Sequence, residues 1–257
     1  MTQPDWSQLA PNAANHAPLS PVSFLKRSAR IYPDKTAIID GEARLTYRQF
    51  EQRARALAAG LAACGVVSGD TVAVLSRNRH EMLEARYGIP MAGGVMNPVN
   101  IRLDAATIAF ILGHGRARIA IVDTAFAPAV LDACARMAAP PALVWITNAG
   151  YETPEPGQAY ETLLAAGRDD FAPVTPADEW APLTLSYTSG TTGDPKGVVY
   201  HHRGGYLAAM SNAMAFEMTA ASVYLWTLPM FHCDGWGYVW SVTAMGATHV
   251  CLPAIDA

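Results

Sequence analysis

The spacing of apolar residues changes along the chain, and this change separates predicted helices from predicted strands. Phe24, Leu25 and Ile31 share one helical face, which predicts a helix over residues 21–31. Residues 71–75 (TVAVL) instead form a short and almost continuous apolar run. A run without polar alternation is typical of a strand that is buried on both faces.

Capping and turn residues place the ends of several elements. Thr46 and Gln49 form a capping box that opens a long predicted helix, and Gly65 ends it. Gly41 lies where the chain turns in a predicted hairpin over residues 36–45. The helix and hairpin boundaries therefore rest on hydrogen-bonding and turn chemistry as well as on hydrophobic spacing.

From residue 71 onward, predicted strands alternate with predicted helices. The strands of the first part are 71–75, a segment around 95, 118–123 and 142–147, and its helices are 79–88, 104–112 and 125–137. Residues 148–180 are predicted to be a long connection with one short helix near 160–166. The second part comprises strand 183–187, a glycine-rich loop, helix 202–218, strand 222–227, helix 235–245 and strand 249–252. This order predicts an α/β fold with parallel-sheet βαβ layers.

Composition and charge exclude several classes of protein. Hydrophobic residues make up 51% of the 257 positions and charged residues 16%, which excludes a disordered or collagen-like chain. The net charge of -4 offers no basic footprint for nucleic acid. The four cysteines are widely spaced, without a CxxC pair or metal-ligand spacing, so we interpret them as reduced thiols: Cys64, Cys134, Cys233 and Cys251.

The location predicted from the sequence is cytoplasmic. The N-terminal residues lack both the basic start and the apolar core of a signal peptide. The most apolar stretch, residues 56–67, is shorter than the ~20 residues that a membrane span requires. Residues 1–20 are polar and contain proline, and we expect them to form a flexible N-terminal arm.

The densest chemical signal is the string YTSGTTGDPKG at residues 187–197. Its glycines allow the backbone to approach an anion closely, and successive N–H groups in such a turn form an anion-binding concavity. Four hydroxyls and Lys196 add further donors. Lys196 is followed by Gly197 and preceded by Pro195, so the string is not a Walker A loop. The string therefore predicts a phosphate-binding loop of another kind.

This string resembles the phosphate-loop signature of the AMP-forming adenylate synthetases, the superfamily of acyl-CoA synthetases, luciferases and peptide-synthetase adenylation domains. Residues 228–236 (LPMFHCDGW) resemble the family's LP-x-FH segment, about 40 residues downstream. Further resemblance at residues 45–47, 69–74 and 96–103 extends it over nearly the whole chain. The segments look most like those of medium-chain fatty-acid and related small-acid CoA ligases. The family commonly has Asn where this chain has Asp234.

The resemblance implies a two-step reaction with ATP, Mg²⁺ and CoA. A carboxylate attacks the α-phosphorus of ATP, pyrophosphate leaves, and the thiol of CoA then attacks the acyl-adenylate and releases AMP. The nucleotide-binding residues that it implies are Thr188, Ser189, Gly190, Thr191, Thr192, Gly193 and Lys196. Thr188 is also implied to be the hydroxyl on the Mg²⁺ side.

The resemblance places the acid substrate near residues 230–236. It implies that Met230, His232, Gly235 and Trp236 bind the substrate, with His232 as the catalytic residue near the carboxylate. A Cys233–His232 nucleophile is disfavoured, because adjacent residues in a turn seldom point at one another. The other histidines that we weighed are interpreted as surface or hydrogen-bonded core residues: His80, His114, His201 and His202.

Complete family members are about twice as long as this chain. Residues 21–257 are therefore predicted to be an incomplete AMP-binding (adenylation) N-terminal domain, without the small C-terminal domain and inactive by itself. Two alternatives remain open: a ligase for an aryl or sulfur-containing acid, and a non-catalytic nucleotide-binding module. Strand 249–252 has no following helix to cover it, so we also expect a homo-oligomer through an uncovered C-terminal edge.

Overall fold

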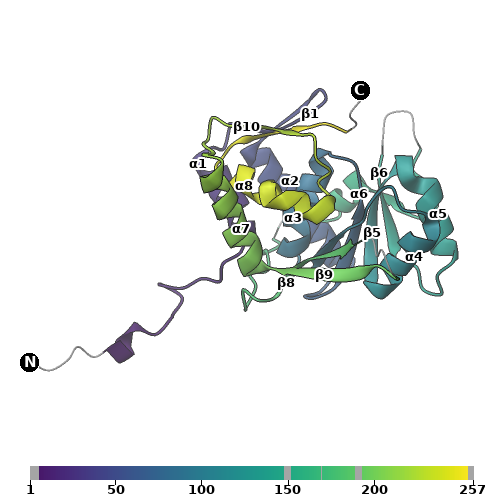
Figure 1. Ribbon diagram of the computed structural model, residues 1–257, viewed down its shortest axis with the longest axis horizontal. Coiled ribbons are helices and arrows are strands. Elements are labelled where there is room, and N and C mark those ends of the chain that lie inside the picture. The colour runs from purple at the N-terminus through teal and green to yellow at the C-terminus, as the bar shows by residue number, and fades with distance from the viewer. Residues whose placement is uncertain (1–5, 148–151, 169, 189–192, 254–257) are drawn as a thin grey trace, which may run out of the picture.

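The computed structural model describes residues 6–147, 152–168, 170–188 and 193–253 (Figure 1). Within these residues, the larger of two sheets has seven strands in the order β7–β6–β5–β3–β4–β8–β9. Its strands are β3 (Thr71–Leu75), β4 (Val95–Pro98), β5 (Ala117–Asp123), β6 (Ala142–Ile146), β7 (Gln158–Ala159), β8 (Pro182–Thr188) and β9 (Lys196–His201). Neighbouring strands are parallel except for the antiparallel pair β8 and β9. The predicted α/β fold class is confirmed.

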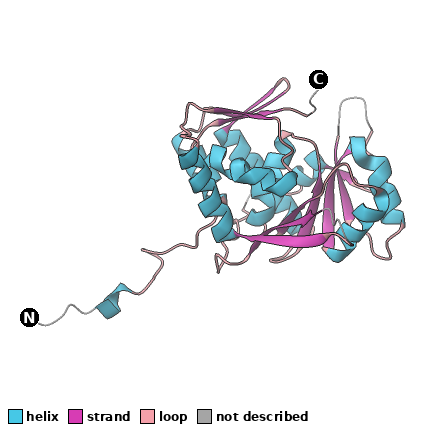
Figure 2. Cartoon of the chain, viewed as in Figure 1, coloured by secondary structure: helices cyan, strands magenta, loops and turns pink. Residues whose placement is uncertain are grey.

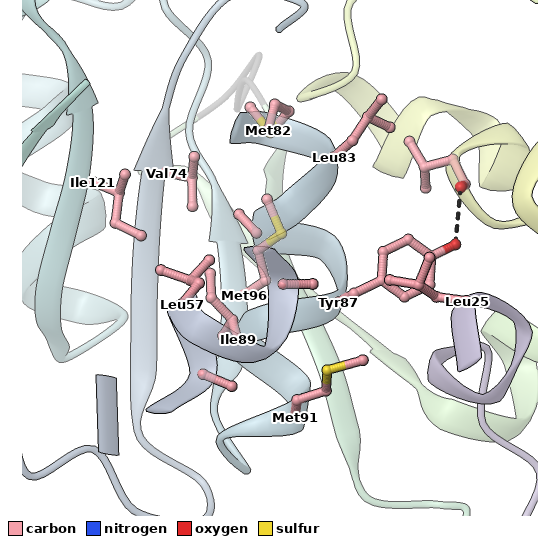
Figure 3. Packing of buried hydrophobic residues seen from close by; sticks show 14 of the residues in the cluster. Leu25, Leu57, Val74, Met82, Leu83, Tyr87, Ile89, Met91, Met96 and Ile121 are labelled. Atoms are coloured by element: carbon pink, nitrogen blue, oxygen red, sulfur yellow. Dashed lines mark hydrogen bonds between the residues drawn. The ribbon is translucent and has the colours of Figure 1, made fainter. Parts of the chain in front are cut away.

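Helices cover the large sheet on both faces, which explains its uninterrupted apolar strands. Along β3, Val72 and Val74 join one buried cluster, whereas Ala73 and Leu75 join the other. The first cluster packs against helices α2 (Tyr47–Ala63), α3 (His80–Met91) and α6 (Tyr160–Ala165), and the second against α4 (Ala105–His114) and α5 (Ala127–Ala135). Figure 3 shows the first cluster, in which Tyr87 of α3 also donates a hydrogen bond to the Val239 carbonyl (3.2 Å).

A second sheet lies on the far side of α2 and α3, so these two helices are enclosed between the sheets (Figure 2). Its strand order is β10–β11–β1–β2 within the described residues, and the strands are β1 (Thr36–Asp40), β2 (Ala43–Thr46), β10 (Val223–Trp226) and β11 (Thr248–Cys251). Strand β11 pairs in parallel with both β1 and β10. The expectation that the last strand forms an uncovered edge is therefore wrong, because the edge position is occupied by β10.

The part of the chain that the structure describes has three further α-helices: α1 (Val22–Ile31), α7 (His202–Ala215) and α8 (Tyr238–Ala244). Short 3-10 segments occur at η1 (Trp6–Leu9) and η2 (Thr124–Phe126), whereas segment η3 (His232–Gly237) contains left-handed backbone. The described part of the N-terminal arm extends away from the body in Figure 1. It meets the body at Leu19, whose N–H donates to Glu179, and at Ser20, whose hydroxyl is 2.8 Å from His202 Nδ1.

The structure differs from the predicted elements at two places that matter for function. The glycine-rich loop is followed by strand β9 rather than directly by a helix, so β8 and β9 form a hairpin. Helix α8 begins at Tyr238 and not at Gly235, because the residues before it adopt a left-handed turn. By contrast, the capping box of α2 is present as predicted, with Thr46 and Gln49 bonding each other's backbone N–H groups.

No helix in the described part of the chain combines the length and the apolar character that crossing a membrane requires.

Candidate active site

The predicted phosphate loop is the connection of the β8–β9 hairpin. Thr188, the last residue of β8, pairs with Lys196, the first residue of β9, and both are exposed. Gly193 has a φ of +155°, which is accessible to glycine and unfavourable for other residues. The four predicted residues between these points lie outside the described residues: Ser189, Gly190, Thr191 and Thr192. The hairpin therefore presents its lysine and its first threonine side by side at one end.

One asparagine holds the backbone that leads into the predicted acid-binding segment. Asn78, which precedes α3, donates from Nδ2 to the carbonyls of Trp226 and Leu228, both at 2.9 Å. Its Oδ1 accepts from the N–H of Met230 at 2.8 Å. These three hydrogen bonds fix an otherwise irregular backbone directly before His232.

Residues 233–236 form a left-handed turn, with φ between +46° and +57° at all four positions. Such a conformation costs L-residues roughly 1–2 kcal/mol each, so surrounding contacts must hold it. At Gly235 a Cβ atom would lie 2.9 Å from the Trp226 ring, and only glycine fits there. Asp234 is buried in this turn and forms an ion pair with Arg86 of α3. The turn is therefore built into the core although His232, directly before it, is exposed.

The hairpin and the turn border one cavity of about 390 Å³, a volume within the range of small-molecule sites. Its lining residues come from three places: Ser186, Tyr187, Thr188, Gly193, Pro195, Val198 and Tyr200 from the hairpin, Phe231, His232 and Cys233 from the turn, and Pro98, Asn100, Leu103, Thr107 and Ile111 from β4 to α4. The segment from β4 to α4 thus meets the hairpin, which follows it at least 75 positions later in the sequence, at one cavity. Burial raises the pKa of the Tyr187 and Tyr200 hydroxyls, so both are uncharged hydrogen-bonding groups near neutral pH.

The structure brings together only part of the predicted site. Thr188, Gly193 and His232 line the cavity, and Lys196 lies beside Thr188 on the next strand. Met230 is fully buried in the core, Gly235 packs against Trp226, and the exposed Trp236 is not among the cavity residues. Three of the four predicted substrate residues therefore lie behind or beside the cavity wall.

Sequence reasoning missed the residues that hold this site. Asn78 and Arg86 had no motif to mark them, since their partners are about 150 positions away. Thr184 and Ser186 could have been found from the sequence, because polar residues alternate with apolar ones along β8. A strand that is covered by helices on both faces would be apolar throughout. Tyr200 lies in the strand that the prediction read as loop.

The other histidines have partners that fit a structural role. The Nδ1 of His201 accepts from the N–H of Gly204 and caps α7, and His80 Nδ1 lies 2.7 Å from Asp40. His114 Nδ1 lies 2.7 Å from the Tyr187 hydroxyl, and His202 bonds Ser20 as described above. Each of these four side chains has a partner in the described structure.

A Mg²⁺ ion finds only part of its ligand set here. Thr188 offers one hydroxyl oxygen, and the described cavity lining contains no carboxylate. Because Mg²⁺ in proteins is held through one or two carboxylates together with phosphates and water, these residues supply too few oxygens by themselves. Asp40, His80 and Glu81 form another cluster of metal-ligand type, but His80 contacts both carboxylates and Arg79 pairs with Glu81.

Comparison with known proteins decides the family. The profile of the AMP-binding enzyme family matches residues 25–257. The chain belongs to this family. The family resemblance inferred from the motifs is confirmed, and the role of the β8–β9 hairpin as its phosphate loop stays a prediction.

Named relatives and a solved structure agree with this assignment. The chain is 42% identical to the peroxisomal butyrate–CoA ligase AAE11 of Arabidopsis thaliana, over 95% of this chain and 45% of that protein. It is 40% identical to the acetate–CoA ligase CCL3 of Humulus lupulus, over 98% and 47%. The inhibitor-bound N-terminal domain of FACL13 from Mycobacterium tuberculosis superposes with a TM-score of 0.80 at 31% identity, over 93% of this chain and 58% of that chain. The chain spans about half the length of the curated relatives.

Proposed function

We propose that this chain forms the phosphate-binding and acid-binding part of an AMP-forming acid–CoA ligase. The observation that carries the proposal is that the hairpin and His232 border the same cavity. An acid held by His232 would then lie next to the phosphates held by the hairpin, as in-line attack on the α-phosphorus requires. ATP and CoA are the implied co-substrates.

Each residue has a distinct role in this proposal. The backbone N–H groups of the loop and Lys196 bind the β- and γ-phosphates and stabilise the charge that develops on the leaving pyrophosphate. His232 donates a hydrogen bond to the substrate carboxylate and orients its attacking oxygen. Thr188 contributes one oxygen toward Mg²⁺, which neutralises phosphate charge when bound. The residues that line this cavity supply only part of the ligand set of Mg²⁺. The roles proposed here therefore belong to side chains and backbone groups of the protein itself.

The proposed substrate is a small aliphatic acid. Apolar residues form part of the cavity lining, among them Leu103, Ile111 and Val198. Both curated relatives described above are named for acids of two to four carbons, which favours the shorter of the medium-chain and related small acids that the motifs indicated. An aryl acid remains the second substrate class, and the cytoplasmic location remains a proposal, since one relative is named as peroxisomal.

The test is acid-dependent exchange of pyrophosphate into ATP by the complete native protein. We expect exchange with acetate or butyrate, weaker exchange with octanoate, and background with benzoate. Faster exchange with benzoate would support an aryl acid ligase. ATP binding without exchange for any acid would support a non-catalytic nucleotide-binding module and contradict the proposed activity.

A further inference from the structure

A charged pair lies buried behind the cavity, where no substrate reaches it. Arg86 of α3 is paired with Asp234 of the left-handed turn, and their side chains are 0% and 1% exposed. Arg86 also donates from its second terminal nitrogen to the carbonyl of Met230. Arg86 Nε has no hydrogen-bond partner among the described residues, so Asp234 is the carboxylate that balances this charge.

The other oxygen of Asp234 reaches the strand that carries the phosphate loop. Asp234 Oδ2 accepts from the Thr184 hydroxyl at 2.7 Å and from the Ser186 hydroxyl at 3.3 Å. These two residues lie on the same face of β8, and Ser186 lines the cavity. One carboxylate therefore joins helix α3, strand β8 and the turn that follows His232.

The position of this carboxylate matters because the turn is strained. Four successive left-handed residues persist only where the surroundings hold them. Removing one partner of a buried ion pair leaves the other charge unbalanced in the core, and relaxation of the turn is then the route by which that charge can reach water. Relaxation would move His232, which directly precedes the turn, and Trp236, which is its last residue.

We propose that Arg86 and Asp234 are positioning residues that hold residues 233–236 in the left-handed turn and fix His232 relative to β8. The part of this inference that concerns catalysis rests on the proposed function. The part that concerns geometry does not. The pair thereby keeps the acid-binding histidine and the strand of the phosphate loop in one fixed arrangement.

The geometric part is tested by nuclear magnetic resonance on this chain. Asp234→Asn keeps the shape of the side chain but removes its charge, and we expect the His232 imidazole and Trp236 indole signals to shift or broaden. The double variant Arg86→Gln with Asp234→Asn, which carries no buried charge, should return both signals toward their parental positions. Asp132→Asn breaks the exposed pair with Arg136 and should leave them unchanged.

Thr184→Val serves as a milder second variant, because it removes the 2.7 Å hydrogen bond and leaves both charges in place. It keeps the test open if Asp234→Asn does not fold, and it should shift the same two signals by less. The inference is overturned if Asp234→Asn folds and its His232 and Trp236 signals stay at the parental positions. If Asp234→Asn does not fold, unchanged signals in Thr184→Val overturn it. So does a folded double variant whose signals stay displaced.

The catalytic part is tested by pyrophosphate exchange in the complete protein. We expect Asp234→Asn to lower kcat by about 100-fold, the size of effect that a misplaced reacting group produces, and to raise the KM for the acid more than that for ATP. The double variant should recover most of the rate. A double variant that restores the two signals but not the rate would overturn the catalytic part. If the parent protein shows no exchange, the proposed function fails, while the magnetic resonance result still decides the geometry.

Discussion

The hairpin and the left-handed turn border the same cavity, yet they are built in opposite ways. The hairpin presents exposed groups, Thr188 and Lys196, at the end of a two-stranded ribbon. The turn is anchored by buried polar groups, and its conformation depends on Asp234 and on the lack of a side chain at Gly235. Substitutions in the hairpin should therefore change chemistry without changing stability, whereas those around the turn should change both.

The largest effect is expected for Lys196→Ala. Loss of a charge directed at phosphate should lower the rate of pyrophosphate exchange in the complete protein by about 30- to 1000-fold, equivalent to about 2–4 kcal/mol. The free energy of unfolding should change by less than ~0.5 kcal/mol, because the side chain is exposed. Lys26→Ala, an exposed lysine on α1, is the matched control. A parental rate in Lys196→Ala would show that the hairpin is only a turn.

The next effect concerns His232→Ala, which lies where the two regions meet. A hydrogen bond to a charged group contributes about 1.5–3 kcal/mol, so we expect a loss of roughly 10- to 150-fold in kcat/KM for the acid. ATP affinity, measured by calorimetric titration, should stay near the parental value. His16→Ala, an exposed histidine of the arm, should have no effect. The placement of His232 is wrong if ATP affinity falls while the acid dependence is unchanged.

A third effect tests how the core supports the turn. Trp226, whose ring packs against Gly235, donates from Nε1 to Nδ1 of His249 at 3.1 Å, and burial lowers the pKa of His249 to about 3. Between about pH 3 and 6.5 the unfolded chain therefore binds more protons than the folded chain, and stability falls as the pH falls through this window. His249 alone should lower the free energy of unfolding by about 2 kcal/mol at pH 5 relative to pH 7.

Urea unfolding at pH 5, 6 and 7 measures this loss of unfolding free energy. The nuclear magnetic resonance signals of the imidazoles show which histidine causes it. The His249 signals should not titrate between pH 5 and 8, because burial lowers the pKa of this imidazole to about 3. His202, whose pKa burial lowers to about 4, adds to the same slope, so a His202→Gln variant separates the two contributions. Titration of His249 near pH 6.5 would contradict the prediction.

The smallest effect concerns the strand that leads into the turn. Val223 and Leu225 of β10 are 66% and 50% exposed, and β10 is an edge strand of the small sheet. An exposed edge is a template for pairing, so we expect this chain to self-associate through β10. Leu225→Lys should abolish association, measured by light scattering, with little change in stability, whereas Leu207→Lys on α7 should not. A parent chain that stays monomeric at high concentration would refute this edge contact.

Much of the large sheet could be predicted because its signals are local. The apolar runs of β3, β5 and β6 require cover on both faces, and the structure places alternate residues in two separate clusters. The capping box at Thr46 likewise depends on residues three positions apart. The motif at residues 187–197 could be recognised as a family signature for a related reason, since its residues are successive in the sequence.

The remaining features could not be predicted because their causes are distant in the sequence. The pairing of β11 with β1 joins residues about 210 positions apart, and no local pattern indicates that the last strand lies inside a sheet. Strand β9 was read as loop because the glycines and proline before it favoured an irregular continuation, and its pairing with β8 decided otherwise.

Local sequence patterns were enough to predict the α/β class, the helical cover on both faces of the large sheet and the family to which the chain belongs. The conformation of the predicted acid-binding segment, in contrast, depends on contacts that form only in the folded chain. Residues 235–237 read locally as the start of a helix, but Arg86, Thr184 and Ser186 capture the carboxylate of Asp234. Left-handed backbone is unfavourable for every residue there except glycine, so these contacts between distant parts of the chain are what make it the stable conformation.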